Sequence, residues 1–481
     1  MLRDLLKEGG LYTIANLFTK GISLLLIPFY TACFSPSDYG IIDILVVFGA
    51  FFNAIISLQL GQGLGRYVGD AKIHDLKKIK FASTAINLTL FSYLGFGILA
   101  FVLTNLFIDI LSSDVVIPQS IFYLSLGAII VNGIFYCLGV YFRFLRLSKT
   151  FSIVSLSHAI GNILLTLFLV LVLDYGISGV FIASLIVTPI IVIIQFYLLR
   201  KQFIWYIGKL ELNLLLKFSI PLIPAAIAYA VLGFTDRIFI NEYINSSELG
   251  VYGIGARFAS IVGLIITGFS MALNPIIYET HREENAKHEL SRIFYLFVAI
   301  GTLGVLTLSI FSIETLQVFT NKDYYGASKI MPILYSSILF TGLWMFSPGL
   351  NIYKKTKITA TIVMVSSGIN ILLNYVLINE YGMLGTASST LISAVFNHLI
   401  LYYWAQKYYK IEIKWTKVSI SVFLFFALTY IGSYWIDILQ LSLPAYYGIK
   451  LSLIAVYSIY LIKFKIIDPL YYTKLKALIK S

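Results

Sequence analysis

Basic and polar side chains recur at helical spacing inside segments that are otherwise apolar. Asn16 and Lys20 lie four residues apart on one face of the first such segment, and Arg257 and Ser260 share a face of a later one. A charged side chain near the centre of a bilayer costs a few kcal/mol, so we expect Lys20 and Arg257 to face a wet cavity or a partner. Two cations that face a cavity would suit an anionic ligand.

Three further charges lie close to the ends of apolar segments and are the candidates for ion coupling or gating. They are Asp43 and the adjacent pair Asp236 and Arg237. Asp43 is expected to cap its helix or to neutralise Lys20, and the adjacent pair is expected to lock the end of its segment. Polar stripes in membrane helices serve packing more often than ligand binding, so packing stays open as the alternative for each residue. Lys450 is expected to snorkel to the interface.

Residue patterns for catalysis are missing from the sequence. There is no G-x-x-x-x-G-K-[ST] phosphate loop, no Cys/His cluster with metal-ligand spacing and no hydrolase elbow. The predicted outward loops are also too short to hold an enzyme's active site. The sequence therefore predicts no enzyme, no nucleotide, no metal and no cofactor.

Composition and charge place the chain in a membrane. The 481 residues are 59% hydrophobic and 12% charged, about half the charged fraction of a soluble domain. Of the 35 Lys and Arg residues, 29 fall in alternate connections between apolar segments, 2 in the others and 4 inside the segments. Because cytoplasmic loops retain basic residues, both termini are expected in the cytoplasm. The net charge of +12 is spread over small loops beside anionic lipid, so no nucleic-acid patch is needed to explain it, and no nucleic-acid partner is expected.

Fourteen segments have the length of a transmembrane helix, about 20 apolar residues. They are residues 10–33, 40–64, 81–103, 119–141, 152–173, 179–199, 218–240, 250–274, 292–313, 328–349, 358–378, 383–403, 418–436 and 443–462. The predicted fold class is an all-α polytopic membrane protein.

An internal repeat divides these segments. Ser37-Asp38-Tyr39-Gly40 recurs 210 residues later as Ser247-Glu248-Leu249-Gly250. Each copy would hold six helices and start on the same side, so the copies would be related by a pseudo-two-fold axis along the membrane normal. The expected organisation is a lobe at 1–199, a cytoplasmic linker at 200–217, a second lobe at 218–403, and two extra helices with a basic tail at 404–481.

The motifs of both halves resemble one family. Residues 8–16, 27–30, 37–40 and 58–66 are similar to the first two helices of bacterial polysaccharide-unit flippases of the Wzx type, which handle O-antigen or capsule units. In the second half, residues 217–224, 235–240 and 248–252 stand where that family has its "LPL…DR…GxY" run. The resemblance implies the fold of the multidrug/oligosaccharidyl-lipid/polysaccharide (MOP) exporter superfamily, a pair of six-helix bundles.

The resemblance also implies a substrate, an undecaprenyl-pyrophosphate-linked oligosaccharide moved from the inner to the outer leaflet of the cytoplasmic membrane. Lys20, Arg257, Asn16 and Ser260 would then offer cations and hydrogen bonds to its diphosphate and sugars. Transport would be ion-coupled alternating access. Partners would be the lipid-linked oligosaccharide and membrane lipids, with a polysaccharide polymerase and a chain-length regulator as further candidates. A lipid II flippase and a multidrug/cation antiporter of the same superfamily stay open as alternatives.

Overall fold

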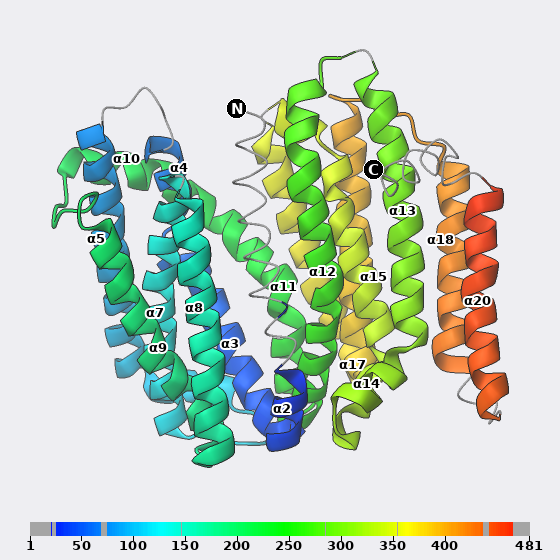
Figure 1. The fold of residues 1–481 in the computed structure, drawn as a ribbon, viewed down its shortest axis with the longest axis horizontal. Coiled ribbons are helices and arrows are strands. Elements are labelled where there is room, and N and C mark those ends of the chain that lie inside the picture. Colours follow the sequence, from blue (N-terminus) through cyan, green and yellow to red (C-terminus); the bar gives the residue numbers. More distant parts are fainter. Residues whose placement is uncertain are drawn as a thin grey trace. The chain divides into compact units, whose positions relative to one another are not determined.

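The computed structural model describes residues 21, 26–68, 75–145, 147–283, 285–353, 355–435 and 442–464, which form helices joined by short loops with no β-strand among them. The chain divides into two compact units, one of residues 1–253 with 374–382, the other of residues 254–373 with 383–481. Figure 1 shows how the helices of each unit run alongside one another. The prediction of an all-α polytopic membrane protein is confirmed.

The first unit contains the helices of the first half of the chain and the beginning of the second. Its helices are α2 (Ile27–Cys33), α3 (Pro36–Ile56), α4 (Leu60–Val68), α5 (Asp75–Val102), α6 (Thr104–Leu111), α7 (Gln119–Phe144), α8 (Ser148–Leu167), α9 (Gly176–Leu199), α10 (Lys209–Ser219), α11 (Ile223–Tyr243) and the first turns of α12 (Ser246–Thr280). Helix α11 packs against α3, so sequence from both predicted lobes meets inside this unit.

The second unit holds the remaining helices. They are the rest of α12, α13 (Ala286–Ile310), α14 (Ser312–Phe319), the short 3-10 helix η3 (Lys322–Lys329), α15 (Met331–Gly342), α16 (Gly349–Ile352), most of α17 (Thr356–Gln406), α18 (Trp415–Tyr430) and α20 (Leu443–Lys463). Helix α13 contacts α15, α18 and α20. The two C-terminal helices therefore pack on the body of this unit.

Eleven helices in the described residues are long and apolar enough to cross a bilayer, or up to twelve when the bent pair Lys322–Lys329 and Met331–Phe346 is one span. Helix α17 alone has 51 residues, about 76 Å at 1.5 Å per residue, more than twice the thickness of a hydrocarbon core. It is interrupted at Gly382, whose φ of 53° and ψ of −133° are not helical, and it contains the eleventh and twelfth predicted segments. Most of the first predicted segment lies outside the described residues, so the count of fourteen stays a prediction.

The second predicted segment, residues 40–64, is wrong as a single helix. Helix α3 ends at Ile56, and Leu58 and Gln59 adopt left-handed φ angles of 45° and 51° before α4 begins at Leu60. Non-glycine residues adopt this conformation rarely, and no Gly or Pro marks the break in the sequence. Helix α4 then packs against α5, α7 and α10.

Candidate functional site

Three of the predicted charged residues form one cluster in the first unit. The Arg237 Nε donates to the Asp43 Oδ2 at 2.9 Å, and the Arg237 Nη1 lies 3.4 Å from the Asp236 Oδ1. Asp43 and Asp236 are 8% and 5% exposed. The backbone N–H of Arg237 also donates to the Asp236 Oδ1 at 3.0 Å. The cluster therefore ties α3 to α11 through a half-buried guanidinium.

Helix α12 completes this cluster with an aromatic hydroxyl. Tyr252 is fully buried and its hydroxyl donates to the Asp236 Oδ2. The guanidinium carbon of Arg237 lies 5.7 Å from the ring centroid of Tyr252 and 5.8 Å from that of Phe234, within the range of cation–π attraction. With both carboxyls ionised, these groups hold two negative charges against one positive charge. We call Asp43, Asp236, Arg237 and Tyr252 the charge cluster.

Beside the charge cluster, the two copies of the internal repeat meet. A Cβ on Gly40 would lie 2.9 Å from the carbonyl carbon of Ser246, and one on Gly250 would lie 2.7 Å from the carbonyl carbon of Pro36. Gly40 and Gly250 are repeat equivalents, and so are Pro36 and Ser246, so the contact is reciprocal. Reciprocal contact is what a two-fold axis between the copies produces. Only residues without a side chain allow the two helices to come this close.

Hydrogen bonds from a loop fasten the start of α12 at this end of the first unit. The Asp114 Oδ1 accepts from the backbone N–H and the hydroxyl of Ser246 at 2.8 and 2.7 Å. The Ser246 Oγ also lies 3.1 Å from the Ser37 Oγ. Burial raises the pKa of Asp114, but the hydrogen bonds from Ser246 and Ser113 lower it by more, so its pKa lies below the usual value. An ionised Asp114 thus holds α12 next to α3.

The polar face of α12 is less available to ligands than its sequence indicates. Arg257 is half-buried and Ser260 is exposed, and the hydroxyl of Ser260 donates to the carbonyl of Arg257 at 2.6 Å. Thr267 and Ser270 likewise donate to carbonyls of their own helix. These hydroxyls keep acceptor lone pairs only. Lys20 and Asn16, the other predicted substrate contacts, lie outside the described residues.

The expectation that Lys450 snorkels is wrong. Lys450 is 1% exposed, and its Nζ lies 2.7 Å from the Glu314 Oε1 and 2.7 Å from the hydroxyl of Tyr446. This pair joins α20 to α14 within the second unit. Glu314 and Lys450 are 136 residues apart, so no local spacing in the sequence indicates their contact. The i,i+4 spacing of Tyr446 and Lys450 was the one readable signal.

His158 is a helix contact in the first unit. Its Nε2 lies 2.9 Å from the Thr188 Oγ1, and its ring stacks on Phe135 at 4.1 Å. The chain of polar groups continues through Ser184 to Asn132, which donates to Ser184 at 2.9 Å. These bonds join α7, α8 and α9 across the unit.

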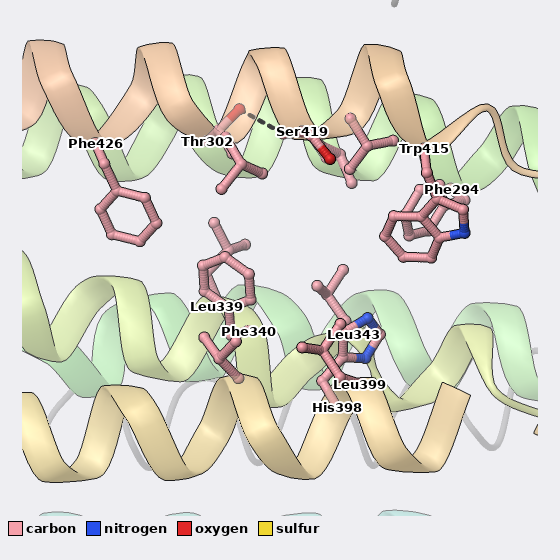
Figure 2. Close-up of a pocket in the computed structure, with 14 residues that line it drawn as sticks. Phe294, Thr302, Leu339, Phe340, Leu343, His398, Leu399, Trp415, Ser419 and Phe426 are labelled. Atoms are coloured by element: carbon pink, nitrogen blue, oxygen red, sulfur yellow. Dashed lines mark hydrogen bonds between the residues drawn. The ribbon is translucent and has the colours of Figure 1, made fainter. Parts of the chain in front are cut away.

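An apolar cavity of about 270 Å³ lies within the second unit, between α13, α15, α17 and α18. In Figure 2, Phe426, Ser419 and Trp415 lie opposite His398 and Leu399 across this space. The lining contains no Asp, Glu, Lys or Arg. The cavity suits an apolar group and offers no fixed charge to a phosphate.

Comparison with known proteins agrees with this architecture. The chain is 23% identical over 356 residues to an uncharacterised membrane protein of Haemophilus influenzae, covering 71% of this chain and 82% of the relative. The lipid II flippase MurJ in an inward closed conformation superposes with a TM-score of 0.67 at 18% identity, covering 94% of this chain and 99% of MurJ. The Vibrio cholerae MATE transporter VcmN in the bent form gives a TM-score of 0.54 at 16% identity, covering 84% and 97%.

The chain therefore has the fold of the MurJ and MATE transporters. Residues 221–376 match the MatE family. Residues 5–281, more than half of the chain, match the family described as polysaccharide biosynthesis protein, and the chain belongs to that family. The resemblance to a polysaccharide family is thereby confirmed, and the Wzx type stays a prediction.

Proposed function

We propose that this protein translocates undecaprenyl-pyrophosphate-linked oligosaccharide units from the inner to the outer leaflet of the bacterial cytoplasmic membrane. The observation that carries the proposal is the match of residues 5–281 to the polysaccharide biosynthesis family. The loop charges support an orientation with both termini in the cytoplasm. Residues 1–199 and 218–403 would act as two six-helix lobes, and residues 404–481 would supply two further helices.

The diphosphate is the part of such a substrate that is hardest to move across the membrane. It cannot cross about 30 Å of hydrocarbon without groups that replace its hydration, whereas the lipid tail can stay in the bilayer. Lys20 and Arg257, one in each repeat, supply those charges in our proposal. Asn16 and Ser260 supply weak, exchangeable hydrogen bonds to the sugars, because tight binding would prevent release.

The charge cluster is the gate and the coupling site in this proposal. It links α3 to α11 and α12, and these helices must separate if access alternates between the two membrane faces. Its second carboxylate lacks a matching cation among the four residues of the cluster, so an entering proton or sodium ion would balance the charge. Entry or loss of that ion would change the strength of the contact that holds the helices together.

A strain lacking the protein tests the substrate. We expect undecaprenyl-linked oligosaccharide to accumulate in the inner leaflet, and purified protein in liposomes with a proton or sodium gradient to move that lipid without ATP. Accumulation of lipid II instead would favour the lipid II flippase. An unchanged lipid-linked pool with loss of cationic drug efflux would refute the proposal in favour of an antiporter. Co-purification with the glycan polymerase or chain-length regulator would test those partners.

The cationic site has a matched control just beyond the end of the same helix. Replacing Arg257 by Ala should lower glycan export several-fold at unchanged protein level, and Arg257→Lys should restore part of it. Arg282 is exposed and lies two residues beyond the end of α12, so Arg282→Ala should leave export unchanged. Equal export by the Arg257→Ala and Arg282→Ala variants would remove Arg257 from the site.

A further inference from the structure

The loop that connects α9 to α10, residues 200–208, has a fixed backbone; together with the first two residues of α10 we call it the linker loop (residues 200–210). The Oγ of Ser83 and the Oγ1 of Thr84, both on α5, accept backbone N–H groups of this loop at 3.0 and 3.2 Å. The Nδ2 of Asn87 and the hydroxyl of Tyr141 donate to two of its carbonyls at 3.2 and 2.9 Å. All four side chains belong to the first unit, so the linker loop is part of that unit.

Because hydrogen bonds hold the backbone of the linker loop, the fold fixes the outward direction of its apolar side chains. Trp205 is 79% exposed, and Ile204 and Ile207 are 45% and 44% exposed. Phe203 points the other way and packs on the core of the unit, and its ring meets that of Trp205 edge to face at 5.3 Å. The exposed indole of Trp205 packs on the ring of Phe203. Its exposure to water costs free energy, so it favours an amphipathic environment.

The exposed charges in residues 200–210 are all positive, and the adjacent Glu211 is buried. Arg200, Lys201 and Lys209 are exposed, and residues 200–210 include no Asp or Glu. Lys80 on α5 adds a further exposed cation, with its Nζ 5.4 Å from the ring centroid of Tyr206. The surface therefore combines an aromatic, two branched aliphatic residues and a rim of cations.

The position of the linker loop identifies the partner. It connects the candidate spans Gly176–Leu199 and Lys209–Tyr243, so it lies at a boundary between membrane and water. Tryptophan prefers this boundary, and basic side chains near it attract anionic headgroups. We propose that the linker loop binds anionic phospholipids of the adjacent leaflet, with Trp205, Ile204 and Ile207 inserted at the level of the headgroups and Arg200, Lys201 and Lys209 contacting the phosphates.

Fluorescence of Trp205 tests this docking. In a variant with Phe at the other four tryptophans, Trp205 should be quenched by a nitroxide on the lipid headgroup and shielded from aqueous acrylamide. Quenching by a headgroup-labelled anionic lipid should exceed that by a labelled neutral lipid. Each substitution of Arg200, Lys201 or Lys209 by Gln should weaken that preference roughly fivefold, the factor that corresponds to about 1 kcal/mol per basic residue.

A matched control is a variant that keeps only Trp435, which is 55% exposed in the second unit, and its quenching should not depend on lipid charge. If removal of four tryptophans prevents folding, the native sequence serves instead. Anionic lipid that co-purifies with it should then be lost in the Arg200→Gln, Lys201→Gln, Lys209→Gln variant. Free access of acrylamide to Trp205 with no quenching from lipid would overturn the proposal, and would fit a docking surface for a cytoplasmic protein. Displacement of the bound anionic lipid by inorganic phosphate would also overturn the proposal, because a site for a simple anion would then explain the binding.

Discussion

Breaking the contact between Asp43 and Arg237 should open the end of the first unit where the repeats meet. The two side chains are 2.9 Å apart, with only 10% and 15% of their surfaces exposed. Removal of one partner from a buried ion pair costs about 3–5 kcal/mol. For Asp43→Asn we expect the lower end of that range, because the amide retains an acceptor oxygen. About 3 kcal/mol corresponds to a change of roughly 100-fold in an equilibrium between closed and open states.

A cross-link between the repeats measures that equilibrium. The hydroxyls of Ser37 and Ser246 are 3.1 Å apart, so a cysteine at each position, in a background without Cys33 and Cys137, should oxidise to a disulfide while this end is closed. Asp43→Asn should slow the oxidation by one to two orders of magnitude. Replacing Asp43, Asp236 and Arg237 together by apolar residues should restore most of the rate, because no unpaired charge stays buried.

Cysteines at Asn132 and Ser184, whose side chains are 2.9 Å apart on α7 and α9, provide the control. Their oxidation should not respond to Asp43→Asn. If the Ser37–Ser246 pair oxidises equally fast with and without the charge of Asp43, the cluster does not hold this end closed. A lower melting temperature alone would then assign it to the stability of the fold.

Three further predictions concern other contacts. Lys450→Met should lower the free energy of unfolding, by about 3 kcal/mol at the lower end of the range for buried pairs, because it leaves the half-buried Glu314 without its cation, and adding Glu314→Leu should recover most of that loss in a thermal melt. Gly250→Ala should slow oxidation of the Ser37–Ser246 cysteine pair, since its Cβ would lie 2.7 Å from the carbonyl carbon of Pro36; an unchanged rate would show that the helices adjust without cost. Because the folded pKa of Asp114 is lowered, its contribution to stability is present above the unfolded pKa of about 3.9 and is lost as pH falls through the folded pKa; Asp114→Asn should remove this acid sensitivity from the melting temperature.

Sequence reasoning succeeded where a single segment carries the information. The apolar runs identify most of the helices because length and hydropathy decide whether a helix can span a bilayer. The break at Leu58 and Gln59 was missed, because its left-handed residues are neither Gly nor Asn. Gly382 was placed before the start of the twelfth segment, yet nothing in the sequence indicates that helical geometry resumes directly after it.

Contacts between distant segments could not be read in the same way. Asp43 and Arg237 are 194 residues apart, so no local spacing in the sequence indicates their contact. Lys450 was expected at the interface because a lone lysine usually snorkels, whereas a glutamate on a neighbouring helix keeps it buried. The sequence predicted residues 200–217 only as a linker between the two lobes. It gave no indication that hydroxyls of α5 hold the backbone of this segment.

The crossing of Gly40 and Gly250 bears on how a duplicated chain acquires a charge at its symmetry axis. The equivalent of Asp43 in the second copy, 210 residues later, is Gly253, and a Cβ on Gly253 would lie 3.0 Å from the carboxyl carbon of Asp43. An assembly of two identical copies would place two aspartates face to face here, and their carboxylates would repel each other. Because both copies belong to one chain they can differ, and here one copy holds Asp43 where the other holds Gly253. The charge cluster is thus a property that a symmetric pair of identical copies could not have.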